Sequence, residues 1–251
     1  EAIDEAVAEH VIGGVISLLK GIVRGHEYVV SGDWFRRGWP SWMRGGLLTG
    51  RTLGLIGAGR IASLIIQKSM CLGIHKAYYW SRSRKQLLDL LFQARRVSIE
   101  DVFALSDVVI NTLPLTEETK GLIDYGLLSK LRRGAVFVNV GRGKVVKHED
   151  LIRLLRERED VKVFLDVYPE EPMSPNDPLI KEFGRSGRVL LTPHVGGYSE
   201  ESMRATAVLA ALQAKRFIEK GCVWNPLTSC CRVCEESPPS LKDVMNSMLR
   251  Y

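Results

Sequence analysis

The stretch TLGLIGAGRIA, residues 52–62, decides the fold. An apolar run of strand length leads into the pattern GxGxxA, and apolar residues at helical spacing follow it. In this setting Gly57 permits a tight turn, Gly59 lets the backbone approach a pyrophosphate, and Ala62 allows a helix to pack closely on the strand. The N–H groups at the start of that helix would bind the phosphates. The stretch therefore predicts a dinucleotide-binding unit of strand, turn and helix.

Five further apolar runs have the length of buried strands, and helical patterns separate them. They are residues 76–80, 108–112, 135–140, 161–167 and 189–192. Continuous apolar strands that alternate with helices are typical of a parallel sheet covered on both faces. We therefore expect an α/β fold with a Rossmann-type doubly wound parallel sheet. The NAD(P)-binding domain is expected to span residues 1–226.

The two ends of the chain differ from this pattern. Apolar residues at helical spacing predict a long helix up to Arg24, and residues 25–50 have no sustained period and predict an irregular excursion. Capping signals predict helices over residues 125–132, after Asp177-Pro178, and over residues 199–220. Residues 227–251 form a C-terminal tail, in which residues 240–250 have a short amphipathic pattern.

Composition excludes several classes of protein. The chain has 251 residues, 45% of them hydrophobic and 25% charged, so it is neither disordered nor collagenous. The formal net charge of +6 is scattered along the chain, and no nucleic-acid partner is expected. The longest apolar run, residues 11–23, is interrupted by Lys20 and is too short to span a bilayer, so no membrane association is expected.

Five cysteines make an odd count in a chain long enough to bury its own core. This argues for a reducing compartment, and a soluble protein of the cytoplasm is expected. Cys222, Cys230, Cys231 and Cys234 lie near the C-terminus, and the last two form a single CxxC. Because a structural zinc ion needs four ligands, no metal site is expected; the tail holds incidental thiols or a redox pair.

The segment after the second strand favours one cofactor over another. It reads Trp80-Ser81-Arg82-Ser83-Arg84-Lys85, and the next acidic residue is Asp89. A ribose with a free 2′-hydroxyl is usually held by an acidic residue at this place, whereas serines and arginines suit a 2′-phosphate. A solvated basic loop would give the same pattern. The segment predicts that NADP is preferred, with NAD as the alternative.

Three polar motifs follow the last three long strands. They are Asn139-Val-Gly-Arg142-Gly143, Asp166-Val-Tyr-Pro-Glu-Glu171 and Thr192-Pro-His194-Val-Gly196-Gly197. Open α/β sheets bind their ligands at the carboxyl ends of the strands. With these motifs in this order, residues 4–226 resemble the D-isomer-specific 2-hydroxyacid dehydrogenases. The segment from Leu113-Pro114 to Thr119 also resembles that family's cofactor-side loop.

The resemblance implies a catalytic set of Arg142, Glu171 and His194. His194 would exchange a proton with the substrate oxygen, Glu171 would orient its ring, and Arg142 would bind the substrate carboxylate. By spacing alone, Glu170 could replace Glu171. The expected cofactor-binding residues come from the glycine turn, the basic segment and the strand ends: Gly57, Gly59, Arg60, Ile61, Ser81, Arg82, Arg84, Leu113, Pro114, Thr119, Val140, Gly141, Asp166, His194, Gly196 and Gly197.

The implied function is that of an oxidoreductase. It would transfer a hydride between NAD(P)H and a small 2-oxo acid or D-2-hydroxy acid, as glyoxylate/hydroxypyruvate reductases do. Most of the family's N-terminal substrate domain is not in the sequence, and the resemblance implies a homodimer through the helix within residues 1–24. The alternatives are a phosphoglycerate dehydrogenase-like enzyme, a non-catalytic dinucleotide-sensing module similar to corepressors, and a cofactor domain from a truncated gene.

Overall fold

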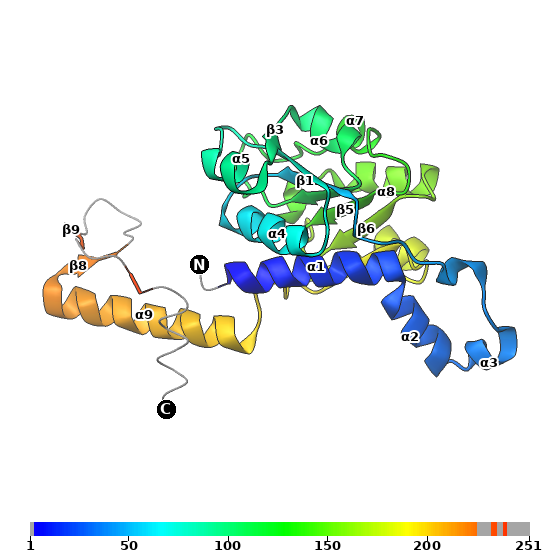
Figure 1. Ribbon diagram of the computed structural model, residues 1–251. Coiled ribbons are helices and arrows are strands. Elements are labelled where there is room, and N and C mark those ends of the chain that lie inside the picture. The colour runs from blue at the N-terminus through cyan, green and yellow to red at the C-terminus, as the bar shows by residue number, and fades with distance from the viewer. Residues whose placement is uncertain (1–2, 225–231, 235–237, 240–251) are drawn as a thin grey trace. The chain divides into compact units, whose positions relative to one another are not determined.

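A parallel sheet of seven strands organises residues 7–196, in the order β3-β2-β1-β4-β5-β6-β7 (Figure 1). The structure is a computed structural model that describes residues 3–224, 232–234 and 238–239. The strand order runs outward from β1 in both directions, which confirms the doubly wound α/β fold. The strands are β1 (Thr52–Ile56), β2 (Lys76–Trp80), β3 (Arg95–Arg96), β4 (Val108–Asn111), β5 (Val136–Asn139), β6 (Lys162–Leu165) and β7 (Val189–Leu191).

All six strands expected from apolar runs are present, four of them shorter than predicted. β3 was not predicted. It consists of two exposed arginines at the edge of the sheet and pairs with β2 through Tyr78 and Tyr79. Two charged residues carry no apolar signal, and the strand is defined by its backbone pairing with β2 at the edge of the sheet.

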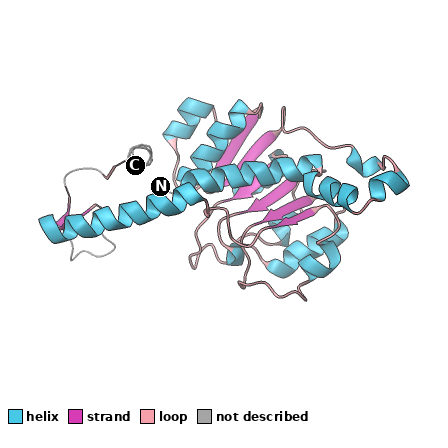
Figure 2. Ribbon diagram, turned by 90° about the horizontal axis from the view of Figure 1, so that it is seen from below, coloured by secondary structure: helices cyan, strands magenta, loops and turns pink. Residues whose placement is uncertain are grey.

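Helices cover both faces of the sheet (Figure 2). Alternate strand residues feed two cores: Val108 and Ile110 face one, whereas Val109 faces the other. The first core includes α1 (Asp4–Lys20), α4 (Arg60–Cys71) and α5 (Gln86–Phe92). The second includes α6 (Ile99–Leu105), α7 (Tyr125–Leu128), the short helix η2 (Gly143–Val145), α8 (His148–Glu157) and the π-helical turn η3 (Leu179–Phe183).

The N-terminal helix is shorter than predicted. α1 ends at Lys20 because Gly21 takes a left-handed conformation with φ 66°, and α2 (Ile22–Val30) continues at an angle of 59°. The predicted irregular excursion also contains α3 (Asp33–Arg37) and the 3-10 helix η1 (Ser41–Met43). Among the described residues no single helix is long and apolar enough to cross a membrane, although the bent pair α1–α2 passes by length and composition.

α1 is held on the sheet by apolar burial in the first core and by two contacts with β6. Its apolar side chains at Val7, Ala8, Val11, Val15, Leu18 and Leu19 are buried in the first core. The Nζ of Lys162 donates to the Leu18 carbonyl oxygen over 2.7 Å, and burial lowers the pKa of this lysine. Gly14 lies against the ring of Phe164, so closely that an added Cβ would be 2.2 Å from Cε1. The apolar face of α1 is therefore already covered.

Two further capping signals are confirmed at the residues that carry them. Asp124 accepts from the Leu127 N–H, but α7 ends at Leu128, four residues before the predicted end. Asp177 accepts from the Leu179 N–H at 2.8 Å, directly before η3.

The second compact unit contains residues 1–6 and 197–251. Its long helix α9 (Glu200–Lys220) begins with a capping box between Ser199 and Ser202 and ends at Gly221, as predicted. The short strands β8 (Cys222–Val223) and β9 (Arg232–Val233) pair in parallel, and Cys222 forms a disulfide with Cys234. Of the two alternatives for the tail, incidental thiols are wrong for this pair, because the strand pairing brings their Cα atoms to 5.3 Å and a disulfide joins them. The amphipathic pattern of residues 240–250 lies outside the described residues.

Two adjacent glycines of α1 should respond in opposite ways to alanine. Gly13→Ala should raise the free energy of unfolding by about 0.5–1 kcal/mol, because no atom lies within 4 Å of the new methyl group and alanine favours the helix. Gly14→Ala should lower it by about 1–3 kcal/mol, because the methyl group collides with Phe164. Urea unfolding of the two variants measures both changes, and equal effects would contradict the packing of α1 on β6.

Candidate functional site

The carboxyl ends of β1, β2 and β4 open onto a cavity of about 510 Å³. This volume lies within the range of small-molecule and cofactor pockets, roughly 300–1,000 Å³. Three predicted segments line it: the glycine turn, the basic segment and the cofactor-side loop. The lining residues are Gly57, Ala58, Gly59, Trp80, Ser81, Arg82, Ser83, Lys85, Thr112, Leu113, Pro114, Thr116, Glu118, Thr119 and Leu122.

The glycine turn has the geometry of a phosphate cradle. Gly57 has φ 95°, and an added Cβ there would lie 2.7 Å from the Thr112 Oγ1, so only glycine fits. At Gly59, which caps α4, no atom lies within 4 Å of an added Cβ. A side chain at Gly59 would fill the space in front of the helix N-terminus, where a pyrophosphate would approach the free N–H groups. These residues fit a dinucleotide.

Not every residue of the basic segment 81–85 lines the cavity. Ser81 and Arg82 line the cavity as predicted, and Ser83 and Lys85 join them. Arg84 does not: its Nε donates to the Oδ2 of Asp89 at 2.5 Å. That hydrogen bond also lowers the pKa of Asp89, as does the one from the Tyr79 hydroxyl. The structure thus separates Arg84 from the other cofactor-binding candidates.

One acidic residue that lines this cavity was not predicted from the sequence. Glu118 lines it from the loop after β4, and its carboxylate accepts from the Thr116 hydroxyl at 2.6 Å, which lowers the pKa of Glu118. The predicted lining residue Thr119 holds the same loop, because its hydroxyl donates to the Pro114 carbonyl oxygen at 2.7 Å.

His194 and Glu171 form a hydrogen-bonded pair. The Nδ1 of His194 lies 2.7 Å from the Glu171 Oε2, and both side chains are partly exposed. The other carboxylate oxygen, Oε1, accepts from the Tyr168 N–H at 2.9 Å. Burial raises the pKa of Glu171, but the bonds from His194 and Tyr168 outweigh it and hold that pKa below its ordinary value. The structure thus selects Glu171, and not Glu170, as the partner of the histidine.

The histidine sits on a turn that a buried carboxylate holds in place. His194 has φ 55°, an unusual conformation for a residue with a side chain. Asp166 is 3% exposed and accepts from the N–H of Val195 at 2.9 Å and of Gly196 at 2.8 Å. The resemblance assigns Asp166 to the cofactor, but both of its oxygens are already engaged with the turn that carries His194.

Two residues outside the predicted set complete the surroundings of Asp166. The Thr192 hydroxyl donates to Oδ1 at 2.6 Å, and the Nε2 of His10 lies 3.0 Å from that hydroxyl and 3.3 Å from Oδ1. Burial raises the pKa of Asp166, but these partners and the two N–H groups lower it below its ordinary value. His10 lies on α1, far from the motif in sequence, so no local signal could have identified it.

A buried amide pair shapes the turn before Arg142. Asn139 accepts through Oδ1 from the Nδ2 of Asn111 at 2.9 Å and from the Gly141 N–H at 3.2 Å. Asn111 also accepts from the Leu113 N–H at 3.2 Å. The signal in the sequence is a polar residue at the end of each of two neighbouring apolar strands.

Arg142 is exposed, and its Nη1 donates to the carbonyl oxygen of Gly141. The next residue, Gly143, packs so closely on Tyr168 that an added Cβ would lie 1.9 Å from the carbonyl carbon. Since the Tyr168 N–H binds Glu171, the Arg142 turn rests on the backbone that holds the His194–Glu171 pair. Within the described residues no hydrogen bond or ion pair joins Arg142 to that pair.

The remaining candidates lie where the motifs place them. Arg60 and Ile61 form the first turn of α4, and Val140 is buried directly after β5. Gly197 is the first residue of the second unit's longer segment and is described with that unit.

Comparison with known proteins shows which family has this sequence pattern. The family model described as D-isomer specific 2-hydroxyacid dehydrogenase, NAD binding domain, matches residues 12–196. A glyoxylate reductase of Aeropyrum pernix is 36% identical over 210 residues, which are 82% of this chain and 61% of that protein. Glyoxylate/hydroxypyruvate reductase B of an Enterobacter species is 33% identical over 229 residues, 90% of this chain and 69% of that protein.

Solved structures of similar fold include enzymes of the same kind. The NADPH-dependent glyoxylate/hydroxypyruvate reductase of Sinorhizobium meliloti, in complex with NADP and malonate, superposes with a TM-score of 0.81 at 26% identity and covers 94% of this chain and 71% of that one. The chain spans about three-fifths of the length of the first curated relatives, 61% and 62%. With the glycine turn, the strand-end motifs and the family model in agreement, the chain belongs to the NAD-binding domain family of the D-isomer specific 2-hydroxyacid dehydrogenases.

Proposed function

We propose that this chain supplies the cofactor site and the proton-transfer residues of an NADP-preferring oxidoreductase that reduces small 2-oxo acids, of the glyoxylate/hydroxypyruvate reductase kind. The observation that carries the proposal is the His194–Glu171 pair, 2.7 Å apart, on the turn after β7 of a sheet whose other strand ends form a dinucleotide cavity. Relatives named glyoxylate reductase support the substrate class.

The chain's own residues suit three tasks in this reaction. When bound, the cofactor supplies the hydride that reduces the carbonyl carbon. Since Nδ1 of His194 is bonded to Glu171, Nε2 is the nitrogen that gives a proton to the substrate oxygen. The ionised Glu171 stabilises the protonated ring. The forked guanidinium of Arg142 binds the substrate carboxylate and polarises the carbonyl.

The basic segment supports a preference for NADP. Four residues of the segment line the cavity: Ser81, Arg82, Ser83 and Lys85. Ser83, Arg82 and Lys85 offer hydroxyl and cationic donors to a 2′-phosphate, whereas the Ser81 hydroxyl donates to the Ser83 carbonyl oxygen at 2.6 Å. The solved reductase of Sinorhizobium meliloti holds NADP. NAD stays the alternative cofactor, and a phosphoglycerate dehydrogenase-like enzyme stays the alternative within the family.

A non-catalytic dinucleotide sensor is the second candidate from another class. Such a module needs the cavity but has no chemical need for a general acid. The bond between His194 and Glu171, on a strained turn that Asp166 stabilises, favours the enzyme. A reductase assay with glyoxylate, hydroxypyruvate, pyruvate and phosphohydroxypyruvate, each with NADPH and NADH, separates the readings.

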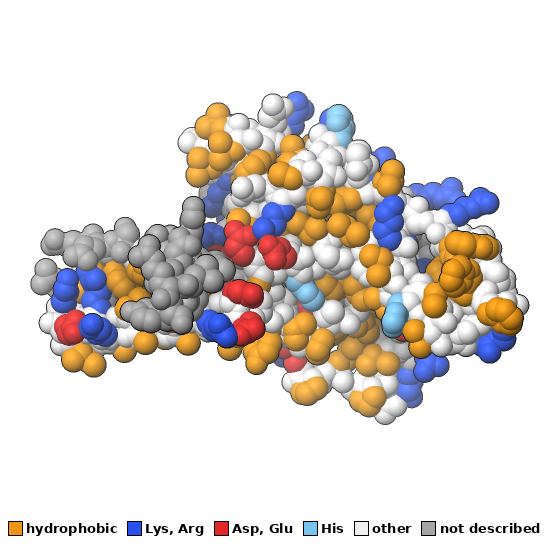
Figure 3. All heavy atoms as spheres, turned by 60° about the horizontal axis from the view of Figure 1, so that its bottom comes forward, with side chains coloured by type: hydrophobic (Ala, Val, Ile, Leu, Met, Phe, Trp, Pro, Cys, Tyr) orange, Lys and Arg blue, Asp and Glu red, His pale blue; other side chains and the backbone are white. Residues whose placement is uncertain are grey.

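We also propose a homodimer, but through a different surface from the one predicted. The apolar face of α1 is buried in its own core, whereas α2, α3 and the segment that follows expose Val30, Trp34, Phe35, Trp39 and Leu47. Figure 3 shows apolar side chains gathered there with Lys and Arg around them. An apolar patch of this kind is typical of a protein interface. The absence of nucleic-acid and membrane partners stays a prediction.

Localisation in the cytoplasm, expected from the odd cysteine count, also stays a prediction. The disulfide between Cys222 and Cys234 is the observation that weighs against a fully reducing environment.

Turnover should depend on the pair at the end of β7. In protein that reduces glyoxylate or hydroxypyruvate with NADPH, His194→Ala should lower kcat by about 10²–10⁴, the usual contribution of a positioned acid–base group. NADPH affinity should stay nearly intact, because the imidazole acts on the substrate oxygen and not on the dinucleotide phosphates. Glu171→Gln should lower kcat less and move the alkaline limb of the reduction profile to lower pH, because the protonated ring loses its carboxylate partner.

Steady-state kinetics across pH measure both effects, and Glu170→Gln is the matched control. If the alkaline limb of the pH profile moves equally in Glu171→Gln and Glu170→Gln, Glu171 is not the carboxylate that stabilises the protonated ring of His194. Unchanged turnover in His194→Ala would overturn the reductase mechanism and favour the sensor.

The cofactor preference should depend on Arg82. Arg82→Ala together with Ser81→Asp should weaken NADPH binding by about tenfold to a hundredfold, since a hydrogen bond to a charged group contributes about 1.5–3 kcal/mol. NADH affinity should stay the same or rise. Fluorescence titration with both cofactors gives the ratio, and tight NADH binding by the unmodified protein, equal to that of NADPH, would contradict the preference.

The oligomeric state should depend on the α3 surface. Phe35 is 97% exposed, and Phe35→Ser should convert the dimer to a monomer because a large aromatic contact is lost. Leu90→Ser is the control, since Leu90 is 78% exposed on α5, outside this surface. Light scattering gives the mass, and a dimer that persists in Phe35→Ser and Trp39→Ser would exclude this interface.

A further inference from the structure

The loop of residues 81–85 is braced from behind by an arginine of the unpredicted strand. Arg96 of β3 donates through Nε to the Ser81 carbonyl oxygen at 3.1 Å. Its Nη2 donates to the same oxygen at 2.9 Å and to the Arg82 carbonyl oxygen at 3.1 Å. One guanidinium thus binds two successive carbonyl groups of a loop that has no regular secondary structure.

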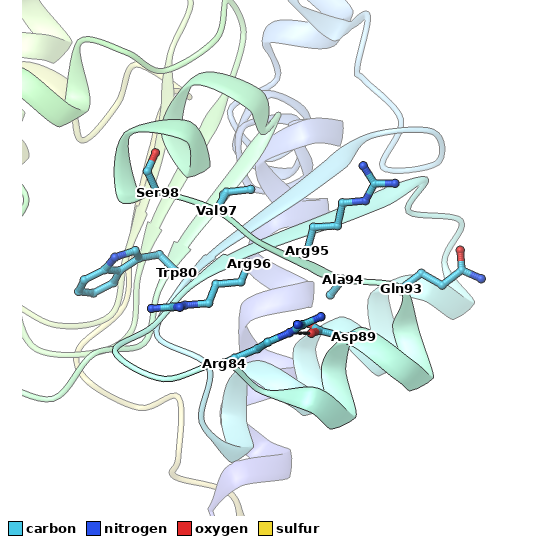
Figure 4. A pocket seen from close by; sticks show the side chains of 9 residues that line it. All are labelled: Trp80, Arg84, Asp89, Gln93, Ala94, Arg95, Arg96, Val97 and Ser98. Carbon is cyan, nitrogen blue, oxygen red and sulfur yellow. Dashed lines mark hydrogen bonds and ion pairs between the residues drawn. The ribbon is translucent and has the colours of Figure 1, made fainter.

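Arg96 belongs to a second cavity, of about 880 Å³, on the other side of this loop. Trp80 lines both cavities. Figure 4 shows Arg84 against Asp89, Arg96 extending past Trp80, and Arg95 leaving the strand in the opposite direction. Because Arg84 and Arg96 are already engaged by protein oxygens, this cavity is better explained as the back of the cofactor loop than as a site for an anion.

The direction of the two carbonyl groups determines the direction of two N–H groups. In a trans peptide the C=O of one residue and the N–H of the next point in opposite directions. With the Ser81 and Arg82 carbonyls turned toward Arg96, the N–H groups of Arg82 and Ser83 point to the opposite side of the loop. Neither N–H has a hydrogen-bond partner within the described residues, and both residues line the cofactor cavity.

We propose that Arg96 is a specificity-determining positioning residue for the 2′-phosphate of NADP. It holds the loop so that the N–H groups of Arg82 and Ser83 and the side chain of Arg82 converge on one anion, and it keeps two carbonyl oxygens away from that anion. Successive N–H groups of this kind form an anion-binding concavity. The inference rests on the proposed NADP preference and adds Arg96 as the residue that holds the loop in the conformation responsible for it.

The test compares the dissociation constants of NADPH and NADH in four proteins by fluorescence titration: the unmodified chain, Arg96→Met, Arg96→Lys and Arg95→Met. Arg96→Met should weaken NADPH by tenfold or more and change NADH by less than twofold. Arg96→Lys keeps the charge but not the fork, and should recover only part of the loss. Arg95→Met removes an equal charge from the next residue and should leave both constants unchanged. Thermal unfolding shows whether each variant is folded.

Different outcomes overturn different statements. If the unmodified chain prefers NADPH and Arg96→Met keeps the same ratio, or loses both cofactors equally, the role of Arg96 is wrong and the proposed function stands. If Arg96→Lys matches the unmodified chain, charge alone acts and the positioning role is wrong. Equal affinity of the unmodified chain for both cofactors would overturn the NADP preference, and the role of Arg96 with it.

Discussion

The carboxylate of Asp166 is the constraint on which the rest of the site depends. It is buried at the end of β6, yet it is ionised, because two N–H groups, a hydroxyl and His10 surround it. Since its pKa is lower in the folded protein than its ordinary value of 3.8, these bonds stabilise the fold above that pH and lose their contribution as the pH falls through the folded pKa. The left-handed conformation of His194 persists because this carboxylate pins the residues that follow it.

The parallel sheet explains why motifs distant in sequence form one site. The carboxyl ends of β1, β4, β5, β6 and β7 lie along the same edge of the sheet. Each polar motif that directly follows one of these strands therefore lies at that edge, whatever its distance from the other motifs in sequence. The close packing of Gly143 on Tyr168, and the bond from Tyr168 to Glu171, then connect neighbouring turns through the backbone. The backbone at Gly143 and Tyr168 thus helps to position the charged groups of the site.

Much of the fold and part of the site could be predicted from the sequence, for reasons that differ by residue. Buried strands and glycine turns leave contiguous patterns, so β1 and the cradle at Gly57 were predictable. Contacts across the sheet leave none: His10 meets Thr192 across 182 residues, and Arg84 turns to Asp89 although its sequence pattern matches that of Arg82. The break at Gly21 depends on one backbone conformation, and the disulfide depends on a pairing of two short strands.

The position of α1 has a consequence for the order of folding. It is synthesised long before β6, on which it packs, and Lys162 meets the Leu18 carbonyl across 144 residues. At a synthesis rate of about 5–20 residues per second, α1 exists for on the order of ten seconds before that strand is made. During this interval the apolar face of α1 has no β6 to pack on, and an isolated helix of this length is only marginally stable. The N-terminal helix therefore reaches its folded packing only after β6 has been made, which couples an early segment of this chain to a late one.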